Sequence, residues 1–148
     1  MAARMEQKAR LLLDAQEIYL QCIKQDNAFW ATASGLEIGL LYRDFYAAIR
    51  AVPTPPELAP ESDEARMYHC VLAKNSHALL RKAMRILDRT QAMAQRLHVH
   101  NDAVSETVAT LEAIKTQYAN ETESCAGVLP AESAEGSAPK PIAPSRTP

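Results

Sequence analysis

Apolar and polar positions alternate with helical periodicity along most of the chain, and the most apolar stretch, residues 27–51, predicts a central helix. Its only charged residues are Glu37, Arg43, Asp44 and Arg50. A surface helix needs only one apolar stripe, so a helix that is apolar nearly all round must be covered on more than one side. We therefore expect the other helices to pack around this one.

A first helix is predicted over residues 2–26, where apolar residues recur at three- and four-residue spacing. These residues are Leu12, Ala15, Ile18, Tyr19, Cys22 and Ile23. Asp26 and Asn27 can end this helix and cap the next one, because a short side-chain oxygen can accept the free amide protons of a first turn. The first two helices should form a tight antiparallel hairpin.

Prolines concentrate in residues 52–60, VPTPPELAP, and separate this hairpin from a second one. Residues 61–97 contain no proline or glycine, and their apolar residues recur in steps of three, four and seven. This pattern predicts one long helix. Its weakest point is Asn75-Ser76-His77, where the helix could kink or break because such side chains compete for backbone hydrogen bonds.

A fourth helix is expected after the turn at residues 98–102, with Asn101 or Asp102 as its cap and an end near Thr122. From Ser124 onward the chain is rich in proline and poor in large apolar residues, so it cannot bury enough surface to offset the entropy of ordering. The prediction is an all-α protein of four antiparallel helices in two hairpins. It comprises a helical domain, residues 1–123, and a disordered Pro-rich tail, residues 124–148.

Charge and hydropathy narrow the classes of partner. The net charge is −2, with 16 basic and 18 acidic residues, so no overall field directs the chain to nucleic acid or to an anionic membrane. No apolar run approaches the roughly 20 residues of a membrane span, and the first ten residues lack the apolar segment of a signal peptide. We expect a soluble chain with no membrane span, and the compartment stays open.

The residues that usually carry chemistry show no catalytic pattern. Cys22, Cys70 and Cys125 are too few and too scattered for a disulfide framework or a zinc site, and the first two are interpreted as small core residues. His98 and His100 are two imidazoles without a third ligand nearby. No phosphate loop and no nucleophile with a placed base is present. We therefore predict no enzyme, no cofactor and no metal.

Two helices carry parts of the tetratricopeptide repeat, a helix pair of about 34 residues. Ile38-Gly39-x2-Tyr42 fits the pattern of the first helix of a pair, and Ala15-x3-Tyr19-x2-Cys22 fits that of the second. In this pattern small residues let paired helices approach closely while large ones fill the opposite groove. The first predicted helix would then be the second half of one repeat, and the central helix the first half of the next.

The whole layout resembles the C-terminal helical modules of large tetratricopeptide-type proteins of delta-proteobacteria, notably myxobacteria. The resemblance covers roughly residues 12–120, and its most distinctive part is the crossover Val52 to Leu58. Its other parts are Ala15 to Tyr19, Phe29-Trp30, Leu36 to Tyr42, Phe45 to Ile49 and His100 to Tyr118. Such relatives are thought to be scaffolds of the cell envelope, some linked to gliding machinery. The resemblance implies a non-catalytic scaffold in the cell envelope or periplasm.

In tetratricopeptide folds the first helix of each pair lines the groove that holds a partner. Carried onto the central helix, the resemblance predicts that a protein partner contacts Ala33, Leu36, Leu40, Arg43 and Asp44. The apolar residues would supply burial and Arg43 could pair with a carboxylate. The simpler alternative is that Leu36 and Leu40 belong to the core.

A second surface candidate is a basic stripe on the long helix, opposite its apolar seam. It consists of Lys74, Arg81, Arg85, Arg89 and Arg96. Such a stripe can contact phosphate, which gives the alternative of a small helical nucleic-acid-binding or regulatory factor. The favoured interpretation of the stripe is a solvated face. A metal-dependent enzyme is the weakest option.

The favoured hypothesis is a non-catalytic scaffold or adaptor for protein–protein interaction. A chain that begins in mid-repeat leaves apolar surface on its first helix, and exposed apolar area of this kind tends to be buried by association. We therefore predict a homodimer, with nucleic acid as the less favoured partner.

Overall fold

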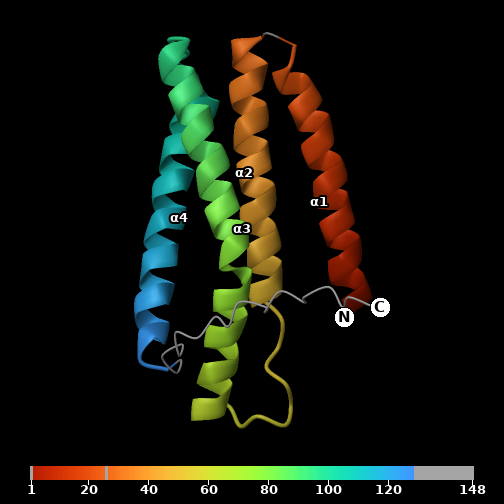
Figure 1. The fold of residues 1–148 in the computed structure, drawn as a ribbon, viewed down its shortest axis with the longest axis vertical. Helices are drawn as coiled ribbons and strands as arrows, with labels where there is room; N and C mark the ends of the chain where they lie inside the picture. Colours follow the sequence, from red (N-terminus) through yellow and green to blue (C-terminus); the bar gives the residue numbers. More distant parts are fainter. Residues whose placement is uncertain (1, 26, 129–148) are drawn as a thin grey trace, which may run out of the picture.

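The computed structural model describes residues 2–25 and 27–128, which form four α-helices and no strand. The helices are α1 (Ala2–Ile23), α2 (Ala28–Arg50), α3 (Asp63–Arg96) and α4 (Asp102–Ala126). They run up and down beside one another, with α1 and α2 as one antiparallel pair and α3 and α4 as the other (Figure 1). The predicted all-α architecture of two helical hairpins is confirmed.

The central position predicted for α2 is confirmed, because its backbone packs closely against each of the other three helices. Within the described residues α1 packs in this way only against α2, so it lies at one side of the molecule (Figure 1). The core combines residues of α2, α3 and α4 with Leu12 of α1. Its largest fully buried apolar side chains are Ile38, Tyr46, Leu80, Leu87, Leu111 and Ile114. Leu12 is the one residue of α1 that is buried.

Polar side chains begin three of the helices. Asn27 caps α2 by accepting hydrogen bonds from the amides of Phe29 and Trp30, as its position predicts. The Ser62 hydroxyl accepts from the amide of Ala65 at 3.1 Å and caps α3. These bonds satisfy amides that have no partner within their own helix.

Asn101, the other predicted cap, also joins two helices. Its Oδ1 accepts from the amide of Val104 at 2.9 Å, and its Nδ2 donates to the Thr32 hydroxyl at 3.2 Å. The start of α4 is thereby fixed to the first turns of α2.

The long helix α3 is continuous over 34 residues, so the break considered at Asn75-Ser76-His77 does not occur. The Ser76 hydroxyl donates to the carbonyl of Leu72 at 2.6 Å, which keeps its hydrogen bond inside the helix. The His77 side chain is buried against α4. Tertiary contacts therefore outweigh the local competition for backbone hydrogen bonds.

Two glycines of α2 let α3 approach closely. A Cβ atom at Gly35 would lie 2.1 Å from Oγ1 of Thr90, and one at Gly39 would lie 2.4 Å from Cδ2 of Leu87. Both distances are shorter than a non-bonded contact allows. Because the Thr90 and Leu87 side chains are buried, they have little room to move aside. The glycines are therefore required by packing between α2 and α3.

The boundary predicted after Glu123 is too early, because α4 continues to Ala126. The Ser124 hydroxyl donates to the carbonyl of Asn120 at 2.7 Å within this last part of the helix. The rest of the predicted tail, from residue 129 onward, lies outside the described residues. Among the four helices, none is long and apolar enough to cross a bilayer.

Candidate functional site

The outer helix α1 exposes more large apolar side chains than any other helix in the described part of the chain. Leu11, Leu13, Ile18 and Leu20 are all exposed, with Ile18 at 66% and Leu13 at 55% of full accessibility. Leu11 and Ile18 lie seven residues apart on one side of the helix, and Leu13 and Leu20 lie on another, about 200° away. Contact with α2 covers only the side of α1 that lies between these two pairs, around Leu12.

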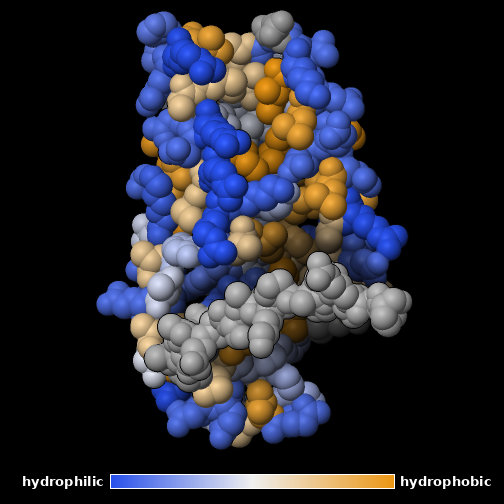
Figure 2. All heavy atoms as spheres, in the orientation of Figure 1, coloured by the Kyte–Doolittle hydropathy of each residue, from blue (hydrophilic) through white to orange (hydrophobic). Residues whose placement is uncertain are grey.

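An open apolar groove runs between α1 and α3, with α2 as its floor. It encloses about 300 Å³. Its lining residues are Gln16, Leu20, Ile23, Gly35, Ile38, Lys82, Ile86, Arg89, Thr90 and Met93. In Figure 2 apolar side chains are exposed between α3 and α1 in the upper half of the view, beside a column of hydrophilic side chains along α3. Gly35 deepens the floor because it has no side chain.

Charged and polar groups stand at the edges of this groove. Lys82 places its ammonium 4.6 Å from the centre of the Tyr42 ring, a cation–π distance. The Tyr42 hydroxyl donates to Oε1 of Gln16 at 2.6 Å, which joins α2 to α1. Arg89 has no hydrogen bond or ion pair within the described residues, so its guanidinium is available to a partner at the edge of an apolar surface.

Exposed aromatic side chains extend the apolar surface at the start of α2. Phe29 and Trp30 are both more than half exposed and contact each other edge to face at 5.1 Å between ring centres. Aromatic residues that project into solvent are enriched at protein interfaces.

The partner-binding residues predicted on α2 lie on a different side of that helix from the groove. Leu36 is buried in the core and Leu40 packs against it. The guanidinium of Arg43 pairs with the carboxylate of the adjacent Asp44 at 2.9 Å, while Ala33 is half-buried. Binding at these positions stays a prediction, but the open apolar groove is lined instead by Gly35 and Ile38 of α2.

The basic stripe is exposed along its whole length but its members face different surroundings. Its residues are Lys74, Arg81, Arg85, Arg89 and Arg96. Arg81 donates to the Tyr118 hydroxyl at 3.3 Å on the α4 side, whereas Arg89 lines the groove on the α1 side. Arg81 and Arg89 lie about 80° apart around α3, so they border different surfaces of the molecule.

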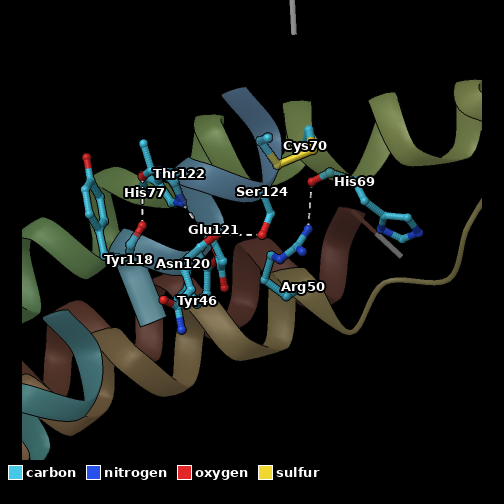
Figure 3. The surroundings of a disulfide bond; sticks show 11 residues. Tyr46, Arg50, His69, Cys70, His77, Tyr118, Asn120, Glu121, Thr122 and Ser124 are labelled. Carbon is cyan, nitrogen blue, oxygen red and sulfur yellow. Dashed lines mark hydrogen bonds and ion pairs between the residues drawn. A yellow bond between two sulfur atoms is a disulfide. The ribbon is translucent and has the colours of Figure 1, made fainter. Parts of the chain in front are cut away.

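Cys70 and Cys125 form a disulfide, which corrects the expectation that the cysteines are too scattered to pair. Cys70 is buried, as predicted, whereas Cys125 lies in α4 and not in the tail. Their Cα atoms lie 5.5 Å apart, and Figure 3 shows the bond joining α3 to the end of α4. Within an antiparallel pair, residues equally far from the turn lie opposite each other. Both cysteines are nearly equally distant from residues 98–101, which is the signal that sequence reasoning missed. Cys22 is the free cysteine of the described residues.

A polar network beside the disulfide centres on the Glu121 carboxylate (Figure 3). It accepts hydrogen bonds from the Tyr46 hydroxyl and from Nε2 of Gln117 at 2.9 Å, and Nε2 of His77 lies 3.3 Å away. Burial alone would raise the pKa of Glu121, but the hydrogen bonds from Tyr46, Gln117 and His77 outweigh it and lower that pKa.

The hydrogen bond to Glu121 also helps to keep the Tyr46 hydroxyl protonated. Burial, followed by the hydrogen bond to Glu121, raises the pKa of the Tyr46 hydroxyl above its ordinary value. At neutral pH the ionised Glu121 carboxylate on α4 therefore accepts a hydrogen bond from the Tyr46 hydroxyl on α2. Arg50 adds a bond from α2 to α3, since its Nη1 donates to the carbonyl of His69 at 2.8 Å. The network ties the ends of three helices together.

The two histidines considered as metal ligands occupy the turn between α3 and α4. His98 has a φ of 53° and ends α3, with the amide of Val99 donating to the carbonyl of Ala94 at 2.9 Å. His100 is exposed. No group of three or more metal-ligating side chains occurs together in the described residues.

Comparison of the chain with protein families, with curated proteins and with solved structures found no match. The tetratricopeptide resemblance therefore rests on the sequence motifs alone. The helix lengths differ from that repeat, because α3 by itself has 34 residues and a whole repeat has about 34.

Proposed function

We propose that the protein is a non-catalytic interaction module that binds a protein partner, either a different protein or a second copy of itself, through the groove between α1 and α3 and its apolar edge. The observation that carries this proposal is the exposed Leu13 and Leu20 side of α1 beside the apolar floor of the groove. Soluble domains rarely leave such contiguous apolar surface uncovered, and a groove between helices is a common seat for an amphipathic helix.

The groove supports a protein partner better than a nucleic acid. Its apolar lining includes Ile38 of α2 and Ile86 and Met93 of α3, side chains that offer burial but no contact suited to phosphate. Nucleic-acid surfaces gather several cations along one path, whereas here Arg81 donates to the Tyr118 hydroxyl of α4 and Arg89 borders the groove.

The scaffold role and the tetratricopeptide-like character implied by the motifs are part of the same proposal. Gly39, which carries the motif match, serves close packing of α2 on α3. A groove between neighbouring helices is also the surface that such repeats use. We place the binding surface at Gly35 and Ile38 rather than at Leu36 and Leu40, which pack in the core.

The disulfide between Cys70 and Cys125 fits a protein of an oxidising compartment. Disulfides persist in secreted and periplasmic proteins and are rare in the reducing cytosol. The Cys70–Cys125 bond therefore supports a role in the cell envelope, periplasm or exterior. Thiol labelling of protein taken directly from its native cells tests this: one reactive thiol per chain is expected, and three would contradict it.

Capture of binding proteins by a tagged full-length chain tests the proposed function. We expect Leu20→Glu to lose partners that the wild type captures, because the new carboxylate lies on the apolar edge of the groove. Val108→Glu is the matched control, since Val108 is 38% exposed on α4 and Leu20 is 36% exposed. Equal capture by the two variants and the wild type would refute the assignment of the groove.

A further inference from the structure

The side chains that line the groove indicate which kind of molecule could bind in it. On α3 its edge carries Lys82 and Arg89, seven residues apart and so about 10 Å apart along the same side of the helix. Between and beyond them lie Ile86 and Met93. An occupant must therefore present an apolar row together with at least one carboxylate at its side.

The exposed side of α1 that borders the groove has this composition. Leu13 and Leu20 form an exposed apolar row, and the exposed Glu17 lies between them on nearly the same side of the helix. Within the described residues Glu17 has no hydrogen bond or ion pair, and the same holds for Arg89. One molecule therefore displays, on adjoining surfaces, an unpaired acid on an apolar helix and an unpaired base on an apolar groove.

We propose that the occupant of the groove is a second copy of this chain. The two copies are related by a twofold axis, and α1 of each lies antiparallel across the groove of the other. Leu13 and Leu20 cover Ile86 and Met93, and the Glu17 carboxylate pairs with the guanidinium of Arg89. Twofold symmetry forms each contact twice, because residue i meets residue j and residue j meets residue i. This inference rests on the proposed function, since it uses the same groove.

Charge reversal in the full-length chain tests the pairing. Sedimentation of wild type, Glu17→Arg, Arg89→Glu and the double variant over a range of concentrations measures the dimer Kd. We expect each single reversal to raise Kd about tenfold or more, because like charges then face each other twice per dimer, and the double reversal to recover most of the loss. Glu106→Arg on α4 is the control and should leave Kd unchanged, since Glu106 is exposed away from the groove.

Three outcomes would overturn the inference: a wild type that stays monomeric at every concentration, single reversals that leave Kd unchanged, or a double variant weaker than both singles. Circular dichroism confirms that these exposed substitutions keep the helical fold. A monomeric wild type whose capture of a different protein still depends on Leu20 would overturn only the second-copy assignment. Capture that is insensitive to Leu20→Glu would remove the proposed function itself.

Discussion

At the scale of single residues, the contact between Gly35 and Thr90 shows how one missing side chain sets a helix spacing. Thr90 donates its hydroxyl to the carbonyl of Ile86 at 2.9 Å, so its rotamer is held by its own helix. A side chain at Gly35 must therefore push α2 away from α3 or force Thr90 out of this rotamer.

Gly35→Ala should lower the free energy of unfolding by about 1–3 kcal/mol, the usual effect of overpacking a core. Urea denaturation measures it. Gly127→Ala is a matched control, because nothing lies within 4 Å of a Cβ at Gly127. Adding Thr90→Ala to Gly35→Ala should recover part of the loss. If Gly35→Ala and Gly127→Ala unfold at the same urea concentration, the close contact is absent.

The lowered pKa of Glu121 predicts a pH dependence of stability. A carboxyl whose pKa is lower in the folded state stabilises the protein above its unfolded pKa, about 4.3, and this contribution is lost as pH falls through the folded pKa. The stability difference between wild type and Glu121→Gln should therefore be largest near pH 7 and shrink below about pH 4.3.

The exposed Glu123→Gln, two residues further along α4, is the control for this series and should show a much smaller difference at every pH. Chemical denaturation at a series of pH values provides the measurement. A difference between wild type and Glu121→Gln that stays constant with pH would mean that Glu121 does not accept these hydrogen bonds while ionised.

At the scale of helices, periodicity and caps were sufficient to predict four elements, because each helix has a local signal. Asn27 and Asn101 mark the starts of α2 and α4, and prolines separate α2 from α3. The continuity of α3 could not be predicted in this way. It depends on packing of the His77 side chain against Tyr118 of α4, which is remote in sequence.

The candidate site was only partly predictable for the same reason. The expectation that α1 leaves apolar surface agrees with the exposure of Leu13 and Ile18. The groove needs three helices in their final places, and no local pattern reports that Gly35 faces α3 or that Arg89 faces α1. The sequence motifs indicated residues of α2, the helix that contributes Gly35 and Ile38 to the groove, but those residues lie on a different side of it.

The disulfide also belongs to this scale, because it fixes the end of α4 to α3. Replacing Cys70 and Cys125 by serine should lower the free energy of unfolding by about 2–4 kcal/mol, chiefly because the unfolded chain regains conformational freedom. The last turns of α4 should then exchange amide hydrogens faster than its first turns, which Asn101 still caps. Hydrogen exchange measured residue by residue along α4 tests this difference between its last and first turns.

Cys22→Ser is the control for the disulfide, since Cys22 is unpaired. It should leave both the unfolding free energy and the exchange of α4 nearly unchanged. If the Cys70→Ser and Cys125→Ser double variant behaves like Cys22→Ser, the two cysteines are not bonded in the folded protein.

At the scale of the whole molecule, α2, α3 and α4 supply most of the core, to which α1 adds Leu12, and the backbone of α1 packs against α2 alone among the described helices. This asymmetry leaves an open groove with an apolar lining and, among the described residues, an unpaired Arg89 at its edge. We therefore propose that this groove is an interface between protein molecules.

Light scattering coupled to size exclusion tests that claim most directly, on the full chain over a range of concentrations. For the wild type and for Val108→Glu we predict a mass of twice the 16.3 kDa chain, and for Leu20→Glu the mass of one chain. A wild type and a Leu20→Glu variant of the same mass at every concentration, with the same captured proteins, would contradict the account.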